Sequence, residues 1–245
     1  MGDGMGLLDQ ILSVFDQTGK PEDRPLVTLS YAQSLDGSIA ARRGRPLQIS
    51  GSKSAVLTHQ LRANHDSILV GVGTVLADDP RLTVRLADGD NPQPVILDST
   101  LRTPLNSALV RAGSPWIATT NRAKPDKVEV FESLGVRLLH LPTGNGGQVE
   151  LQELLGCLYQ MGIRSLMVEG GAGVISSFIN SRLVDFMILT ISPMIVGGLP
   201  AVQMPQDYLK QKENKFPRLG NVLSEYYGDD LIIFGQVEWP ENMGI

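Results

Sequence analysis

From Leu26 onward, short apolar runs alternate with stretches of helical spacing, and this alternation constrains the fold more than any other feature. Each run is rich in Val, Ile and Leu and is bounded by Gly, Pro, Asp or Ser, which is typical of a strand. Continuous apolar strands separated by helices indicate a parallel sheet that is covered on both faces. The expected strands are Leu26–Tyr31, Ser67–Val72, Pro94–Asp98, Trp116–Thr119, Val136–Leu141 and Ser165–Val168.

Three stretches between these strands carry apolar residues at helical spacing. In the first of them we expect Ser52 to be the N-cap, with Leu57 and Leu61 on one face. The expected helices are Ser52–Asn64, Lys127–Leu134 and Leu151–Met161.

The last third of the chain indicates an antiparallel edge added to this sheet. The pattern predicts a strand at Asp185–Ser192, a loop at Pro200–Pro217, and a hairpin of Val222–Tyr227 and Asp230–Glu238 around Gly228-Asp229. We therefore predict one α/β domain over residues 25–240: a mainly parallel twisted sheet, helices on both faces, and a C-terminal antiparallel hairpin.

An extension, residues 1–24, precedes this domain. Apolar residues from Leu7 to Phe15 recur on one helical face, so a short amphipathic helix is expected there. The stretch Gly19–Pro25 is typical of a linker. We expect the helix to dock on the main body or on a partner subunit rather than to take part in catalysis.

Composition narrows the class of protein. Hydrophobic residues make up 42% of the 245 residues and charged residues 19%, which supplies a sizeable core and excludes a disordered chain. A net charge of −5 argues against a nucleic-acid partner. One cysteine and three scattered histidines predict neither an intrachain disulfide nor a metal site. With no apolar run of about 18 residues and no basic leader, we expect a soluble cytoplasmic protein without a membrane span.

The segment Leu166–Phe178 is the most informative local feature, because a buried strand runs into glycines at 170, 171 and 173 and then into a helix. A helix N-terminus carries unpaired N–H groups and a positive dipole end, and glycine lets a phosphate approach the backbone. A tight strand–helix connection that binds nothing has the same pattern. Ser176 replaces the third glycine of the dinucleotide fingerprint and Glu169 precedes the glycines, so a plain Rossmann domain is not expected.

A second glycine pair, Gly71 and Gly73, follows an earlier strand and precedes a turn-forming sequence at 78–80. Strict alternation in Arg81–Arg85 would place both arginines and Thr83 on one face. Two arginines beside a threonine suit an anion, whereas an edge strand with its charges in water explains the pattern equally well.

Two further polar side chains have simple structural explanations. Arg62 ends a predicted helix, where a positive charge complements the dipole. His59 lies on the same helix with no nearby nucleophile, so a catalytic triad is not expected.

A set of motifs occurs in order along the chain: Thr28–Ala40, Leu61–Asp66, Gly73–Arg85, Ile96–Ser99, Val168–Gly171, Leu183–Asp185 and Ile191–Pro193. Taken together, these motifs resemble the riboflavin-pathway pyrimidine reductases, which stand alone or form the C-terminal half of bifunctional deaminase–reductases. The resemblance covers roughly residues 25–238, and the run Thr74–Thr83 is highly specific. The zinc signature of a deaminase half is absent, so only the reductase step is expected.

This resemblance implies a dihydrofolate-reductase-like fold, a homodimer and NADPH as cofactor. The implied reaction reduces a ribosylamino-pyrimidine 5′-phosphate to the ribitylamino compound, with hydride passing from the nicotinamide to ribose C1′. The protein then has to align the two reacting carbons and exclude water.

Motif by motif, the resemblance also implies substrate contacts at Arg62, Leu82, Arg85 and Glu169. The arginines suit a phosphate, and Glu169 suits ribose hydroxyls or the pyrimidine and is the candidate catalytic acid. In a regular strand Leu82 would point away from Arg85, so we expect a main-chain contact or a bent segment there.

The implied cofactor contacts fall in several loops and one helix start. Ser99 and Thr100, with Arg102 or Arg122, are expected around the 2′-phosphate. The cofactor positions are Ala32, Gln48, Thr74, Asp78, Ser99, Gly171, Ala172, Gly173, Val174, Ile175, Ser176 and Ser177.

Two departures from the pattern of the bifunctional enzymes leave alternatives open. Pro46 stands where those enzymes have a substrate-binding Ser, and Gln48 stands where they have a Trp. We interpret both as a difference between branches of the family. The alternatives are a reductase of the same fold acting on another pterin-like or pyrimidine compound, and a nucleotide-binding protein without turnover. No single residue decides whether the pyrimidine is reduced before or after deamination.

Overall fold

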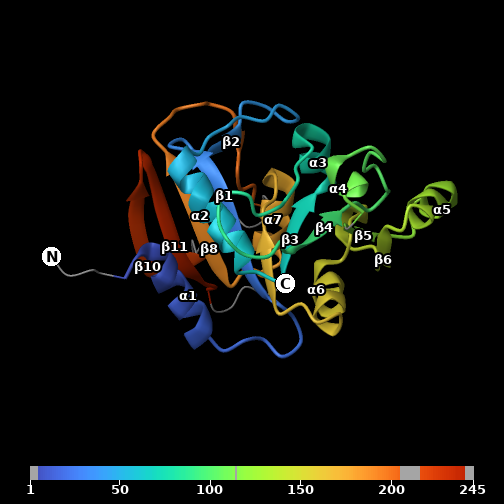
Figure 1. Cartoon of the computed structure of the whole chain (residues 1–245), viewed down its shortest axis with the longest axis horizontal. Coiled ribbons are helices and arrows are strands. Elements are labelled where there is room, and N and C mark those ends of the chain that lie inside the picture. The colour runs from blue at the N-terminus through green and yellow to red at the C-terminus, as the bar shows by residue number, and fades with distance from the viewer. Residues whose placement is uncertain (1–4, 114, 205–215, 241–245) are drawn as a thin grey trace.

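The computed structural model describes residues 5–113, 115–204 and 216–240, and one large sheet forms its centre (Figure 1). The strands of this sheet are β1 (Leu26–Ser34), β3 (Ser67–Gly71), β4 (Gln93–Leu97), β5 (Trp116–Thr119), β6 (Arg137–His140), β7 (Ser165–Val168), β8 (Phe186–Ser192), β10 (Arg218–Tyr227) and β11 (Asp230–Glu238). Within the described residues they lie in the order β10-β11-β8-β1-β7-β3-β4-β5-β6. A separate antiparallel pair joins β2 (Ser38–Ala40) to β9 (Leu199–Pro200).

The direction of the strands follows the prediction. Every neighbouring pair from β8 to β6 is parallel, whereas β11 is antiparallel to β8 and β10 is antiparallel to β11. The mainly parallel sheet with a C-terminal hairpin is therefore confirmed. β5 and β7 have the predicted bounds, while β1 continues three residues beyond Tyr31. Most of the loop predicted at Pro200–Pro217 lies outside the described residues.

Helices cover both faces, as the continuous apolar strands require. Along β1 the side chains alternate, so Val27 and Leu29 pack with α6 and α7 while Leu26 packs with α1 and α2 on the opposite face. α3, α4 and α5 pack on that same opposite face, over β3 to β5. The helices are α1 (Leu7–Gln17), α2 (Ser52–Ala63), α3 (Val72–Asp78), α4 (Ala108–Arg111), α5 (Pro125–Ser133), α6 (Leu151–Gln160) and α7 (Ala172–Asn180).

The N-terminal helix packs on the body of the same chain. Leu7 and Ile11 are buried among side chains of α2, β8 and β11, and the Phe15 ring contacts Phe186 and Phe234. Among the described helices, none combines the length and the hydrophobicity needed to cross a bilayer.

The expected N-cap of α2 is wrong by one residue. Gly51 is the N-cap, and no side chain at this position caps the helix. Instead, the Asp230 carboxylate at the start of β11 accepts hydrogen bonds from the Gly51 N–H at 2.7 Å and the Ser54 hydroxyl at 2.6 Å. A negative charge at a helix N-terminus is favoured by the dipole, so a distant residue supplies what Ser52 does not.

The turn between β1 and β2 is tied to the chain before β9 through Asp36. Its two carboxylate oxygens accept hydrogen bonds from the Ser34 and Ser38 hydroxyls and from the Val196 and Gly197 N–H groups, at 2.6 to 2.9 Å. These donors favour the ionised form and hold the pKa of Asp36 well below its usual range.

Asp36→Asn is expected to release the segment before β9, because an amide has only one acceptor oxygen and turns its NH₂ toward two donors. Hydrogen exchange of the Val196 and Gly197 amides should accelerate about tenfold. Since the folded pKa is depressed, this stabilisation persists above the ordinary Asp pKa of about 3.9 and is lost as the pH falls through the folded value. The exposed Asp90→Asn is the matched control, and equal exchange rates in the two variants would contradict the role of Asp36.

Candidate functional site

The adjacent parallel strands β3 and β7 send their following helices to opposite faces of the sheet. Val72 and Val75 of α3 pack in the core of one face, whereas Ile175 and Phe178 of α7 pack in the core of the other. Where successive connections diverge in this way, a crevice opens at the carboxyl ends of the strands, and ligands of open α/β sheets bind there.

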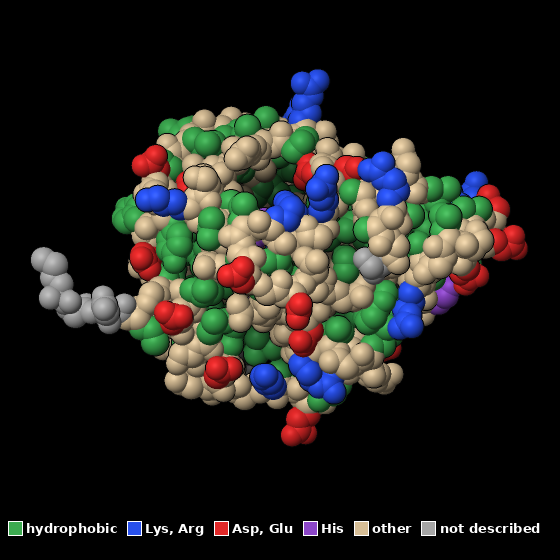
Figure 2. Space-filling view, in the orientation of Figure 1, with side chains coloured by type: hydrophobic (Ala, Val, Ile, Leu, Met, Phe, Trp, Pro, Cys, Tyr) green, Lys and Arg blue, Asp and Glu red, His purple; other side chains and the backbone are tan. Residues whose placement is uncertain are grey.

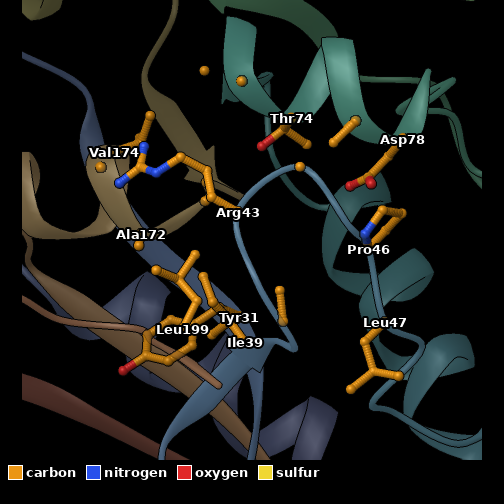
Figure 3. A pocket seen from close by; sticks show the side chains of 18 of the residues that line it. Tyr31, Ile39, Arg43, Pro46, Leu47, Thr74, Asp78, Ala172, Val174 and Leu199 are labelled. Carbon is orange, nitrogen blue, oxygen red and sulfur yellow. The ribbon is translucent and has the colours of Figure 1, made fainter.

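A first cavity of about 370 Å³ lies at this crevice. In Figure 3, Thr74 and Asp78 from α3 lie opposite Ala172 and Val174 from α7, and Arg43 extends from the loop after β2 toward Val174. Burial raises the pKa of Asp78 above its ordinary value. The predicted cofactor positions in its wall are Ala32, Thr74, Asp78, Gly171, Ala172, Gly173 and Val174.

The start of α7 fits an anionic group. Gly171 is its N-cap and no side chain caps the first turn, so the N–H groups of that turn remain available beside the cavity. Two glycines permit close packing against α7. A Cβ at Gly170, just before α7, would lie 2.5 Å from Val174 Cβ, and a Cβ at Gly71, at the end of β3, would lie 2.6 Å from Val174 Cγ2.

The remaining predicted cofactor positions lie outside this wall. Ile175 is fully buried in the core, and the Ser176 hydroxyl accepts a hydrogen bond from the Gln203 N–H at 2.9 Å. Gln48 is exposed on the loop before α2, although Pro46 and Leu47 beside it line the cavity. Ser177 lies farther along α7.

The residues expected around a 2′-phosphate follow β4 and β5. The Ser99 hydroxyl accepts a hydrogen bond from the Val149 N–H at 3.1 Å, and Arg122 Nη1 donates to the Gly147 carbonyl at 2.6 Å. Thr100 is half-buried and Arg102 is exposed in the same region. These residues lie at the carboxyl edge of the sheet, after the first and second strands beyond β3, and outside the wall of the first cavity.

A second cavity of about 270 Å³ adjoins the first, and the two share Ser30, Tyr31, Ala32 and Glu169 in their walls. Figure 2 shows a hollow in the visible face of the molecule with Lys and Arg side chains beside it. Burial raises the pKa of Tyr31, which lines both cavities, to about 12, so its hydroxyl is neutral near pH 7. The other lining residues are Ser50, Ala55, Thr58, His59, Arg62, Arg85 and Thr190.

A two-point ion pair lies in the wall of this second cavity. Arg62 Nε and Nη2 donate to the two carboxylate oxygens of Glu169 at 2.7 and 2.6 Å, and the side chains are only 12% and 17% exposed. Burial opposes the charge of Arg62, but the hydrogen bonds and the attraction of Glu169 outweigh it and raise the pKa of Arg62. Arg62 does end α2, yet complementing the helix dipole is not its main interaction.

The segment after α3 is bent rather than extended. Leu82 adopts a left-handed φ of 54° and buries its side chain in the core beside α3, so the expected bend is confirmed and the edge-strand alternative is wrong. The polar–apolar alternation favours an extended strand here, but burial of the Leu82 side chain favours the bent conformation. Arg62 Nη1 donates to the Thr83 carbonyl at 3.2 Å, and Arg85 Nη1 donates to the Thr83 hydroxyl at 2.8 Å.

Sequence reasoning missed His59 as a site residue. The structure buries it to 5% exposure in the wall of the second cavity, and its Nδ1 accepts a hydrogen bond from the Arg85 N–H at 2.9 Å. The available signal was its position three residues before Arg62, because residues at that spacing share a helix face.

The structure is therefore an α/β protein with two adjoining cavities at the carboxyl ends of its parallel strands. The glycines at the start of α7 and Arg42, Arg43 and Arg45 line the first cavity, and Arg62 and Arg85 line the second. The family model for the RibD C-terminal domain matches residues 25–233. The chain belongs to this family, which confirms the resemblance found in its motifs.

Its relatives include stand-alone and longer proteins. It is 38% identical over 191 residues to the 2,5-diamino-6-ribosylamino-4(3H)-pyrimidinone 5′-phosphate reductase of Debaryomyces hansenii, covering 71% of this chain and 77% of that protein. It is 36% identical over 211 residues to the protein of the same name from Archaeoglobus fulgidus, covering 80% and 94%.

Solved structures agree with these sequence matches. The Saccharomyces cerevisiae riboflavin biosynthesis reductase Rib7 superposes with a TM-score of 0.70 at 27% identity, covering 94% of this chain and 99% of that one. Acinetobacter baumannii RibD superposes with a TM-score of 0.74 at 26% identity over 89% of this chain. This chain spans 59% of the length of that RibD chain.

Proposed function

We propose that the protein is an NADPH-dependent reductase of a 5-amino-6-(5-phosphoribosylamino)pyrimidine in riboflavin biosynthesis. The observation that carries this proposal is the shared wall of the two cavities at Glu169 and residues 30–32. A reductase must hold a cofactor and a substrate side by side, and two adjoining cavities offer room for both.

The first cavity suits the cofactor. When bound, NADPH supplies the hydride. The uncapped first turn of α7, with Gly171 and Gly173, would hold its pyrophosphate, and Thr74 and Asp78 would contact the nicotinamide half. Ser99, with Arg122 nearby, would contact the 2′-phosphate.

The second cavity suits the phosphorylated ribose. Arg85 and Arg62 would attract the phosphate, and Glu169 would orient ribose hydroxyls. Because both Glu169 oxygens accept hydrogen bonds from Arg62, the side chain has the arrangement of a carboxylate acceptor rather than of a proton donor. We therefore propose orientation of the substrate as its role, in place of acid catalysis.

The decisive experiment follows the loss of NADPH absorbance with the purified protein and each pyrimidine phosphate, deaminated and non-deaminated. Oxidation with either compound is the expected result, and the faster one gives the order of reduction and deamination. Oxidation only with other pterin-like or pyrimidine compounds would favour the same-fold reductase with another substrate, to which Pro46 in the cavity wall points. Tight NADPH binding without oxidation of any compound would favour a nucleotide-binding protein.

The proposed homodimer is tested separately by light scattering. A particle of about twice the 26.5 kDa chain mass is expected, and a particle of single-chain mass would contradict it.

A further inference from the structure

His59 links the anion-binding side of the second cavity to the backbone that carries Arg85. Its imidazole is almost fully buried, yet it forms part of the cavity wall together with Arg62, Arg85 and Glu169. It reaches this place from α2, while Arg85 comes from the bent segment after α3.

The hydrogen bond between these two elements determines the tautomer. Nδ1 of His59 faces the Arg85 N–H at 2.9 Å, and a backbone N–H is always a donor, so Nδ1 must be the unprotonated acceptor. The proton of the neutral ring is then on Nε2. None of the described residues accepts a hydrogen bond from Nε2. Nε2 is not among the buried unpartnered atoms of the described residues, so this N–H is open to the cavity that His59 lines, where a ligand oxygen can accept its hydrogen bond in place of water.

We propose that neutral His59 is a substrate-contacting residue whose Nε2–H donates a hydrogen bond to an oxygen of the phosphorylated ribose, while Nδ1 fixes the backbone of Arg85. This inference rests on the proposed function, since it assigns the phosphorylated end of the substrate to the second cavity. One imidazole thereby couples occupancy of the cavity to the position of the Arg85 segment.

The surrounding charges agree with a neutral ring. Burial and then the positive charges of Arg62 and Arg85 lower the pKa of His59, against a smaller opposing effect of Glu169. Protonation of Nδ1 would turn a donor toward the Arg85 N–H and break their hydrogen bond. Binding of the phosphorylated ribose should therefore weaken only below the ordinary His pKa of about 6.5.

Two substitutions separate the two ends of the ring. His59→Asn places an amide oxygen near the position of Nδ1 and removes the distal donor, whereas His59→Gln places an amide N–H near the position of Nε2 and removes the proximal acceptor. The probe is ribose 5-phosphate, with calorimetry as the measurement. Each variant should raise its Kd about fivefold, with an unchanged Kd for NADPH as the internal control. With the full substrate, KM should rise while kcat changes little.

Nuclear magnetic resonance of the ¹⁵N-labelled protein tests the contact without any turnover. The His59 signals, assigned by their loss in His59→Asn, should report a neutral ring protonated on Nε2 and should shift when ribose 5-phosphate is added. The phosphate of ribose 5-phosphate itself titrates at about 6, so the ligand contributes to the pH dependence of its own binding. The same titration with His59→Asn measures that contribution alone, because this variant lacks the imidazole ring.

Three results would overturn the proposal: a proton on Nδ1, no response of the His59 signals to ribose 5-phosphate, or wild-type affinity in His59→Asn. Wild-type affinity in His59→Asn would mean that His59 only positions the backbone of Arg85 and does not contact the substrate. A chain that oxidises NADPH with none of the pyrimidine phosphates, but whose His59 signals still respond to ribose 5-phosphate, would refute the proposed function and support the contact.

Discussion

Arg62→Met should reduce NADPH oxidation with the pyrimidine phosphate by at least about a hundredfold and lower the free energy of unfolding by about 2–4 kcal/mol. The guanidinium holds both oxygens of Glu169 and the Thr83 carbonyl. Its removal leaves a carboxylate that is only 17% exposed without its partner. The loss of activity follows because the same guanidinium lines the cavity proposed for the phosphorylated ribose. Chemical denaturation and initial rates measure the two effects.

A second variant separates stability from activity. In the double variant Arg62→Met/Glu169→Met no unpaired charge is left, so the free energy of unfolding should return to within about 1 kcal/mol of the wild type, while activity stays low. Arg81→Met, which removes an exposed arginine from the neighbouring segment, should change neither quantity. If the double variant regained activity, the pair would serve only the fold. If the single variant were as stable as the wild type, the pair would contribute nothing to stability.

The sheet was predictable because its strands are encoded locally. β5 and β7 are short apolar runs bounded by turn-forming or polar residues, and their bounds agree with the prediction. The hairpin of β10 and β11 follows from the Gly228-Asp229 turn between them. Burial on both faces makes such runs visible in the sequence without knowledge of their partners.

The errors concern partners that are far apart in the chain. The acceptor at the start of α2 is Asp230, which lies 176 residues from Ser54 and which no local pattern connects to it. The pairing of Arg62 with Glu169 spans 107 residues. Each residue was singled out by its motif, but only the fold brings them together.

The segment around Leu82 shows a local signal overruled by packing. Alternation of polar and apolar residues favours a strand, whereas the left-handed φ of 54° turns Leu82 into the core. A leucine at positive φ is unfavourable by itself, and burial of its side chain offsets that cost. His59 was missed for a related reason, because its partner is a backbone N–H and backbone groups carry no sequence signal.

Gly71→Ala should weaken NADPH binding about tenfold and destabilise the fold by about 1–3 kcal/mol. Gly71 ends β3, and an added Cβ would lie 2.6 Å from Val174 Cγ2 in the first turn of α7. Val174 is β-branched and cannot swing its methyl group away freely, so α7 or α3 must move. That movement displaces the N–H groups at the start of α7 from the cavity proposed for the cofactor.

The neighbouring Gly73→Ala is the matched control for stability, because nothing lies within 4 Å of its added Cβ and the residue is inside α3. It should stabilise the fold by about 0.5–1 kcal/mol, since alanine restricts the unfolded chain more than glycine does. In the double variant Gly71→Ala/Val174→Ala the clash is removed, and NADPH affinity should recover. Denaturation curves and fluorescence titration with NADPH measure these effects. Weak binding that persists in the double variant would show that the backbone of Gly71, rather than its packing against α7, is what the cofactor requires.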